Sequence, residues 1–157
     1  LLSEGKLGGF HFNARKYADD DLIVGTVNPF ELFDVFTKLV AAGSKADKIV
    51  YMIDQSHSIE PKIEAMLMSI INCQIALAKA LIVDYPALQT AQMNGDILVA
   101  QSILTKAFET DVYPLLEEVR EEMGVPRDPL SAYRKDNYRQ KIIKERGISE
   151  ANNGYPV

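Results

Sequence analysis

Residues 48–54 have the sequence KIVYMID, and their composition indicates the fold class. Residues 49–53 are all apolar, so this run lacks the alternation of a strand that has one face in water. Strands of this kind are normally buried on both sides, as in parallel sheets covered by helices. Residues 48–54 therefore predict a buried strand in an α/β fold.

Helices are predicted on both sides of this strand. Asn28 and Pro29 form a strong helix start, since a side-chain cap precedes a proline at the first helical position. Gly43 is placed to end that helix. Pro61 begins a longer helix with a mostly apolar side. That side comprises Ile63, Met66, Leu67, Ile70, Ile71, Gln74, Ala78, Leu81 and Ile82.

A second strand is predicted upstream, at residues 7–13 (LGGFHFN). Side chains alternate along a strand, so Phe10 and Phe12 share one face, and His11 and Asn13 share the other. Residues 7–84 therefore have the order strand, helix, strand, helix. This order implies two parallel strands joined by a right-handed crossover.

The rest of the chain is predicted to be helical. The expected helices cover residues 96–109, residues 111–124 and residues 128–146, with a break near Asp136. Residues 149–157 offer little material for a hydrophobic core.

Two parallel strands leave both outer edges without hydrogen-bonding partners. We therefore expect the missing neighbours to come from an upstream part of the same protein or from another chain. The predicted fold class is α/β, the C-terminal portion of a (β/α)8 TIM barrel, and the chain itself is predominantly helical. Residues 1–90 would be the last two strand–helix units of the barrel, and residues 91–157 a helical C-terminal extension.

Composition excludes some function classes and favours one compartment. The formal charge of −5 argues against nucleic-acid binding, which depends on clustered basic residues. The apolar runs are broken by charge short of the roughly 18 residues that span a bilayer, so no membrane partner is expected. Cys73 is the sole cysteine and the first residues do not resemble a signal peptide, so a cytoplasmic location is expected.

Candidate ligands cluster after the carboxyl ends of the two strands, where parallel α/β folds place their sites. His11 and Asp54 terminate neighbouring strands, so their side chains can converge. Asp19 and Asp21 are two positions apart, a spacing that lets both carboxylates reach one ion. Oxygen ligands with an occasional imidazole suit Mg²⁺, Mn²⁺ or Co²⁺. Four ligands cannot fill two such ions, so an incomplete site is expected.

Three motifs give the chain a resemblance to a known family. They are GGFHFN at residues 8–13, KYADDDL at residues 16–22 and MIDQSH at residues 52–57. In these motifs the chain resembles the C-terminal part of the L-rhamnose isomerase family, in its xylose-isomerase-like branch. The likeness continues through residues 80–84, 110–112 and 128–129, and so covers nearly all of the chain. Ala14 departs from the pattern, since relatives carry an aspartate there.

The resemblance implies an enzyme, an intramolecular oxidoreductase that interconverts L-rhamnose and L-rhamnulose and is active only as the full-length protein. It implies two ions per complete site, Mn²⁺ or else Mg²⁺, Co²⁺ or Zn²⁺. His11 and Asp54 would hold the substrate-anchoring ion, and Asp19 and Asp21 the catalytic ion. Asp54 would also act in catalysis by positioning a water. The other ligands would lie upstream, and the protein would be a homotetramer.

Simpler interpretations stay open for each candidate. Three consecutive aspartates are usually a solvated loop, and a histidine between phenylalanines is often a hydrogen-bonded core residue. Asp54 could cap the following helix, and His57 fits a loop residue better than a ligand. For the whole chain, the alternatives are a xylose isomerase or ketose 3-epimerase on the same fold, and a non-catalytic helical assembly module.

Overall fold

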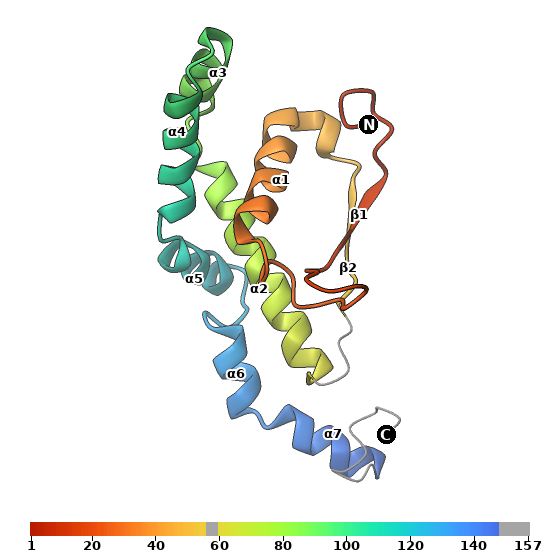
Figure 1. Cartoon of the computed structure of the whole chain (residues 1–157). Helices are drawn as coiled ribbons and strands as arrows, with labels where there is room; N and C mark the ends of the chain where they lie inside the picture. The colour runs from red at the N-terminus through yellow and green to blue at the C-terminus, as the bar shows by residue number, and fades with distance from the viewer. Residues whose placement is uncertain (56–59, 148–157) are drawn as a thin grey trace.

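The computed structural model describes residues 1–55 and 60–147. Two short strands lie beside a long central helix, and a helical hairpin and three further helices follow it (Figure 1). The strands are β1 (Gly9–Phe12) and β2 (Val50–Ile53), and a 3₁₀ turn, η1 (Gly43–Ala46), precedes β2. The helices are α1 (Pro29–Ala42), α2 (Lys62–Leu81), α3 (Tyr85–Asn94), α4 (Ile97–Glu109), α5 (Tyr113–Glu122), α6 (Pro129–Lys135) and α7 (Tyr138–Arg146).

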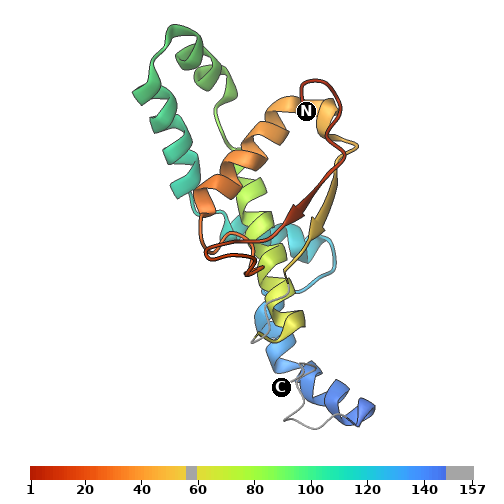
Figure 2. The ribbon, with the colours of Figure 1, turned by 45° about the vertical axis from the view of Figure 1, so that its right-hand side comes forward.

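The two strands pair in parallel, as their order along the chain predicts. The register sets His11 opposite Met52 and Phe12 opposite Ile53. On the face toward the helices, the ring of Phe12 stacks on Phe36 of α1 with centroids 5.6 Å apart. Both α1 and α2 lie on this one side of the sheet (Figure 2). The opposite face, which carries His11 and Met52, is exposed.

The expectation that β2 is buried on both faces is not met within this chain. The exposed fractions of Val50, Tyr51 and Met52 are 64%, 49% and 51%. No third strand joins the sheet within the described residues. The described part of the chain therefore leaves much of the apolar surface of β2 exposed to solvent.

The ends of α1 follow the sequence signals. The Asn28 side chain accepts a hydrogen bond from the Glu31 amide, Pro29 occupies the first turn, and Gly43 follows the last residue. Gly43 has φ of 54°, a conformation that a glycine adopts without steric cost. Phe33 of α1 is fully buried at the centre of the main core.

The buried face of α2 differs from the predicted one. Small residues form most of it, namely Ala65, Ser69, Ala76, Ala78 and Ala80 with Ile71. Ala76 and Ala80 belong to the core cluster that contains Phe33 and Phe36 of α1, whereas Ala78 packs with Val112 and Leu116. Ile63 and Leu81, which were expected on the buried side, are 47% and 61% exposed. The prediction rested on large apolar side chains, whereas alanine and serine make up most of the side of α2 that is buried here.

The helix α3 was not predicted, although its signals are present. The Asp84 side chain accepts a hydrogen bond from the Ala87 amide, and a proline stands in the first turn. Gly95, with φ of 75°, ends α3 and turns the chain into α4. The two helices form a hairpin that extends from the body (Figures 1 and 2). The expected boundary after residue 90 falls inside α3.

The helix α2 also contains the only described segment that is long and apolar enough to cross a membrane, judged by length and composition alone. Core helices of globular proteins pass the same test. Here α2 packs against α1, α4, α5 and α6, which is the position of a central core helix. At the α4 contact, Lys79 donates a hydrogen bond to the Phe108 carbonyl, and its ammonium lies 4.6 Å from the centre of the Phe108 ring.

Candidate functional site

The structure brings two of the four candidate ligands together. His11 is the third residue of β1, and Asp54 directly follows β2. The Asp54 amide donates a hydrogen bond to the Phe12 carbonyl at 2.8 Å, which fixes the two strand ends beside each other. The Nδ1 atom of His11 consequently lies 3.7 Å from Oδ2 of Asp54. Both side chains are more than half exposed, on the sheet face that none of the described helices covers.

This pair has the chemistry and the spacing of two ligands to one ion. An imidazole nitrogen and a carboxylate oxygen are donors that Mn²⁺ and related ions accept. Two donor atoms that share an ion lie about 3 to 4 Å apart when each is about 2.1 Å from it. At 3.7 Å, Nδ1 of His11 and Oδ2 of Asp54 are also too far apart for a direct hydrogen bond. The lone pairs of these two atoms are therefore not engaged with each other.

The loop that carries the three aspartates is closed by an antiparallel bridge between Ala14 and Leu22. Asp20, in the middle, accepts hydrogen bonds from the backbone amides of Lys16 and Tyr17. Its carboxylate therefore stabilises the loop. Asp19 and Asp21, on either side of it, are left to interact with other side chains.

Each outer aspartate has a partner in this structure. The guanidinium of Arg15 is 2.5 Å from Oδ1 of Asp19, and the amide of Asn13 donates to Oδ1 of Asp21 at 2.6 Å. Asp21 also has φ of 29°, a left-handed conformation that is unusual outside glycine. In the described residues, no three His, Cys, Asp or Glu side chains form a group that could hold a metal. The predicted four-ligand set is thus assembled only as the His11–Asp54 pair.

Two residues near this site, Arg15 and Gln55, were not singled out from the sequence, whereas Asn13 was placed beside His11 on the same face of the strand. Asn13 and Arg15 pair with the two outer aspartates, and their closeness in sequence to the DDD run was the available signal. Gln55 is 7% exposed, and its Nε2 donates to Glu60 at 2.6 Å. Its Oε1 accepts no hydrogen bond within the described part of the chain. His57 lies outside the described residues.

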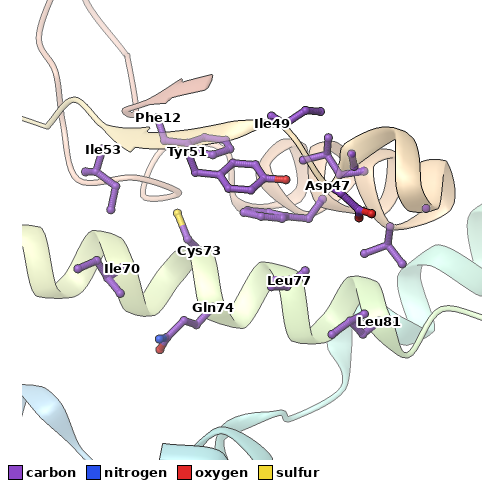
Figure 3. A pocket seen from close by; sticks show the side chains of 15 residues that line it. Phe12, Asp47, Ile49, Tyr51, Ile53, Ile70, Cys73, Gln74, Leu77 and Leu81 are labelled. Carbon is purple, nitrogen blue, oxygen red and sulfur yellow. The ribbon is translucent and has the colours of Figure 1, made fainter. Parts of the chain in front are cut away.

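A groove of about 630 Å³ lies on the other side of the strands, between β2 and α2 (Figure 3). Phe12, Tyr51 and Ile53 line its strand side, and Cys73 and Leu77 its helix side. Burial raises the pKa of the Tyr51 hydroxyl and raises the pKa of the Cys73 thiol to about 11. The groove is thus an apolar environment that disfavours charge.

Cys73 should therefore react slowly with alkylating reagents. With a pKa of about 11, little of the thiol is ionised at pH 8, and only the thiolate is nucleophilic. We expect iodoacetamide to modify Cys73 at least about 10-fold more slowly than free cysteine at pH 8. Mass spectrometry of the intact chain would give the rate between pH 7 and pH 9. A rate that levels off near pH 8.5 would contradict the raised pKa.

Comparison with known proteins indicates a class of activity for proteins that are similar to this chain. No protein-family model matches the chain. A probable sugar isomerase of Mesorhizobium japonicum and one of Rhizobium meliloti are each 43% identical to it over 149 residues. The chain is similar to part of two probable sugar isomerases. The matched region covers 93% of this chain and 35% of each relative, so the chain spans about a third of their length.

The names of these relatives agree with the sugar-isomerase class that the motifs imply. Neither name specifies a sugar or a metal. The similarity extends over nearly the whole chain and therefore includes both the strand–helix part and the later helices.

Proposed function

We propose that this chain is the C-terminal part of a metal-dependent aldose–ketose isomerase that interconverts L-rhamnose and L-rhamnulose. The observation that carries the proposal is the placement of His11 beside Asp54, with 3.7 Å between Nδ1 and Oδ2. A sugar isomerase needs groups that hold an open-chain sugar and polarise its carbonyl. The relatives' names support the class of reaction, and the motifs support the choice of L-rhamnose.

The residues have distinct proposed roles. His11 and Asp54 would hold an Mn²⁺ ion, or Mg²⁺, Co²⁺ or Zn²⁺ in its place. When bound, such an ion acts as a Lewis acid toward the sugar carbonyl and hydroxyl oxygens. Asp54 is 55% exposed at the side chain, so it can also accept a hydrogen bond from a water or a sugar hydroxyl. That contact would position the water or hydroxyl group that carries a proton while hydrogen is transferred between adjacent carbons of the sugar.

Asp19 and Asp21 would help to hold the second ion. To do so, they must bind the cation in exchange for their present contacts with Arg15 and Asn13 or alongside them. Asp20 would keep the loop in shape during that exchange, because it bonds to the backbone of the loop itself. The remaining ligands, and the active homotetramer, would involve polypeptide outside this chain.

The proposal is tested with a full-length chimera, in which this chain replaces the matched 149 residues of the Mesorhizobium japonicum protein. With Mn²⁺ present, the chimera is expected to convert L-rhamnose faster than D-xylose or D-psicose, whereas the 157-residue chain alone gives no turnover. The parent protein serves as the control. Turnover by the isolated chain, or a preference for D-xylose or D-psicose, would contradict the proposal.

One observation favours a second function, subunit assembly. Met93, Ile97 and Leu98 lie at or near the turn of the α3–α4 hairpin, with exposed fractions of 72%, 79% and 84%. If assembly were the whole function, alanine at His11, Asp19, Asp21 and Asp54 would leave it intact. The isomerase proposal requires those same substitutions to remove metal binding.

A further inference from the structure

The loop between Ala14 and Leu22, here called the aspartate loop, is fixed at its base to the body of the chain. Backbone hydrogen bonds join Ala14 and Leu22 in both directions, at 2.9 and 2.8 Å. Just beyond the loop, the Val24 amide donates to the Ser69 hydroxyl of α2, and the Val24 carbonyl accepts a hydrogen bond from the Asn72 side chain. The segments that enter and leave the loop therefore lie side by side in a fixed arrangement.

This arrangement matches two polar side chains of the entering segment with two aspartates of the loop. The Asn13 carboxamide donates to Oδ1 of Asp21 at 2.6 Å, near the base. The Arg15 guanidinium lies 2.5 Å from Oδ1 of Asp19, nearer the tip. Because side chains alternate along an extended segment, Asn13 and Arg15 follow His11 on one face. The proposed ligands and their partners thus share one side of the strand.

The two contacts differ in charge and in exposure. The Asn13 carboxamide is neutral and half-buried, so it fixes the Asp21 carboxylate and leaves its negative charge available to an ion. It engages Oδ1, and Oδ2 is outside this contact. Arg15 carries a charge that balances that of Asp19, and the two side chains are 60% and 82% exposed. An ion at Asp19 must therefore compete with the guanidinium.

We propose that Asn13 is a positioning residue for the Asp21 carboxylate and that Arg15 is a competing cation at Asp19. This inference rests on the proposed function, since it concerns the ion that these two aspartates would help to hold. Loss of a hydrogen bond that orients a metal-binding carboxylate lowers metal affinity by about 10- to 100-fold. An exposed ion pair changes an equilibrium by roughly 5-fold or less. The two contacts therefore act on metal binding in opposite directions and by different amounts.

Mn²⁺ binding by the full-length chimera, followed by electron paramagnetic resonance of the free ion, tests the role of Asn13 without turnover. Asn13→Leu keeps the size of the side chain but removes the donor, and it should lower Mn²⁺ affinity by at least about 10-fold. Asn13→Gln retains a carboxamide and should stay within about 3-fold of the unsubstituted chimera. Equal losses in the two variants would contradict the positioning role.

The melting temperature of the metal-free chimera separates positioning from folding. Both Asn13 variants should change it by less than about 2 °C, because the half-buried carboxamide lies outside the hydrophobic core. A fall of more than about 5 °C in Asn13→Leu would assign the residue to folding and would contradict the proposal.

Arg15→Gln should have the opposite effect on Mn²⁺ affinity. The affinity should rise by about 3-fold at roughly 10 mM ionic strength, and the gain should fall below about 1.5-fold at roughly 0.5 M, because salt screens exposed charges. In an Asp19→Asn background the gain should disappear. A decrease in affinity, or a gain that persists in that background, would contradict the competing role.

The matched control for Arg15→Gln is Lys16→Gln, which removes the neighbouring positive charge of the same loop. The Lys16 ammonium lies 5.3 Å from the centre of the Tyr17 ring, whereas Arg15 contacts Asp19. Lys16→Gln should raise Mn²⁺ affinity by less than about 1.5-fold under the same conditions. Equal gains in the two variants would show that net charge alone is responsible and would contradict the proposal.

These outcomes are separable from those of the isomerase proposal. Affinity changes of opposite sign at Asn13 and Arg15, without turnover of L-rhamnose, would support this inference and contradict the proposed function. Turnover that requires Mn²⁺, with an affinity that neither substitution changes, would support the proposed function and contradict this inference. A chimera that binds no Mn²⁺ would contradict both.

Discussion

Asp54→Asn in the full-length chimera is expected to lower Mn²⁺ affinity by at least about 100-fold and to change the melting temperature by less than about 2 °C. The carboxylate is the charged member of the His11–Asp54 pair, and its side chain is 55% exposed. An amide keeps the shape but removes the negative charge that a divalent ion requires. His11→Ala should have a similar effect on affinity, since it removes the adjacent nitrogen.

Electron paramagnetic resonance of free Mn²⁺ would measure this affinity without a sugar and without turnover. The matched control is Asp47→Asn, at an exposed aspartate that lies on the opposite, groove side of the strands. Its Mn²⁺ affinity should stay within about 2-fold of the unsubstituted chimera. Unchanged affinity in both Asp54→Asn and His11→Ala would remove these residues from the metal site.

Local sequence signals predicted much of the fold correctly. Asn28, Gly43 and Asp128 act at helix ends as expected, because capping depends on residues a few positions apart. The break near Asp136 separates α6 from α7, and Gly147 ends α7. The parallel pairing of the two strands also followed from the order of the elements along the chain.

Properties that depend on distant contacts were predicted less well. The buried side of α2 depends on which parts of the chain cover it. The Ser69 hydroxyl accepts a hydrogen bond from the Val24 amide and is fully buried, whereas Ile63 is 47% exposed. Periodicity locates an apolar stripe, but it does not reveal which part of the stripe this chain covers.

The candidate site, like the fold, was predicted only in part. The convergence of His11 and Asp54 followed from strand order, because parallel strands end at a common edge. The partners of Asp19 and Asp21 depend on the turn between Ala14 and Leu22, whose backbone includes left-handed residues that the sequence did not signal. The metal roles of all four residues remain predictions.

Arg120 joins the later helices to the core, and its loss should have the largest effect on stability. It lies on α5 and is only 5% exposed. Its Nε and Nη2 donate to Oε1 of Gln74 on α2, at 3.2 and 2.7 Å, and its Nη1 donates to the Arg127 carbonyl at 3.1 Å. One side chain therefore connects α2, α5 and the segment that leads to α6.

Arg120→Ala is expected to lower the free energy of unfolding of the 157-residue chain by about 3 kcal/mol. The substitution leaves the Gln74 oxygen and the Arg127 carbonyl without their donors, and it opens a cavity beside α2. Arg120→Lys should cost less, since an ammonium keeps the charge and part of the packing but does not reach both acceptors from one planar group. Urea unfolding followed by circular dichroism would give both values.

The matched control is Arg134→Ala, which removes another arginine that reaches α2, by way of Glu64. That ion pair lies at the surface, with the arginine side chain 60% exposed, so its loss should cost less than about 1 kcal/mol. Equal destabilisation by the two alanine variants would mean that the burial of Arg120 does not increase the stabilisation that its hydrogen bonds provide. A larger loss at Arg120, accompanied by faster hydrogen exchange in α5 than in α1, would identify this guanidinium as the group that holds the C-terminal helices against α2.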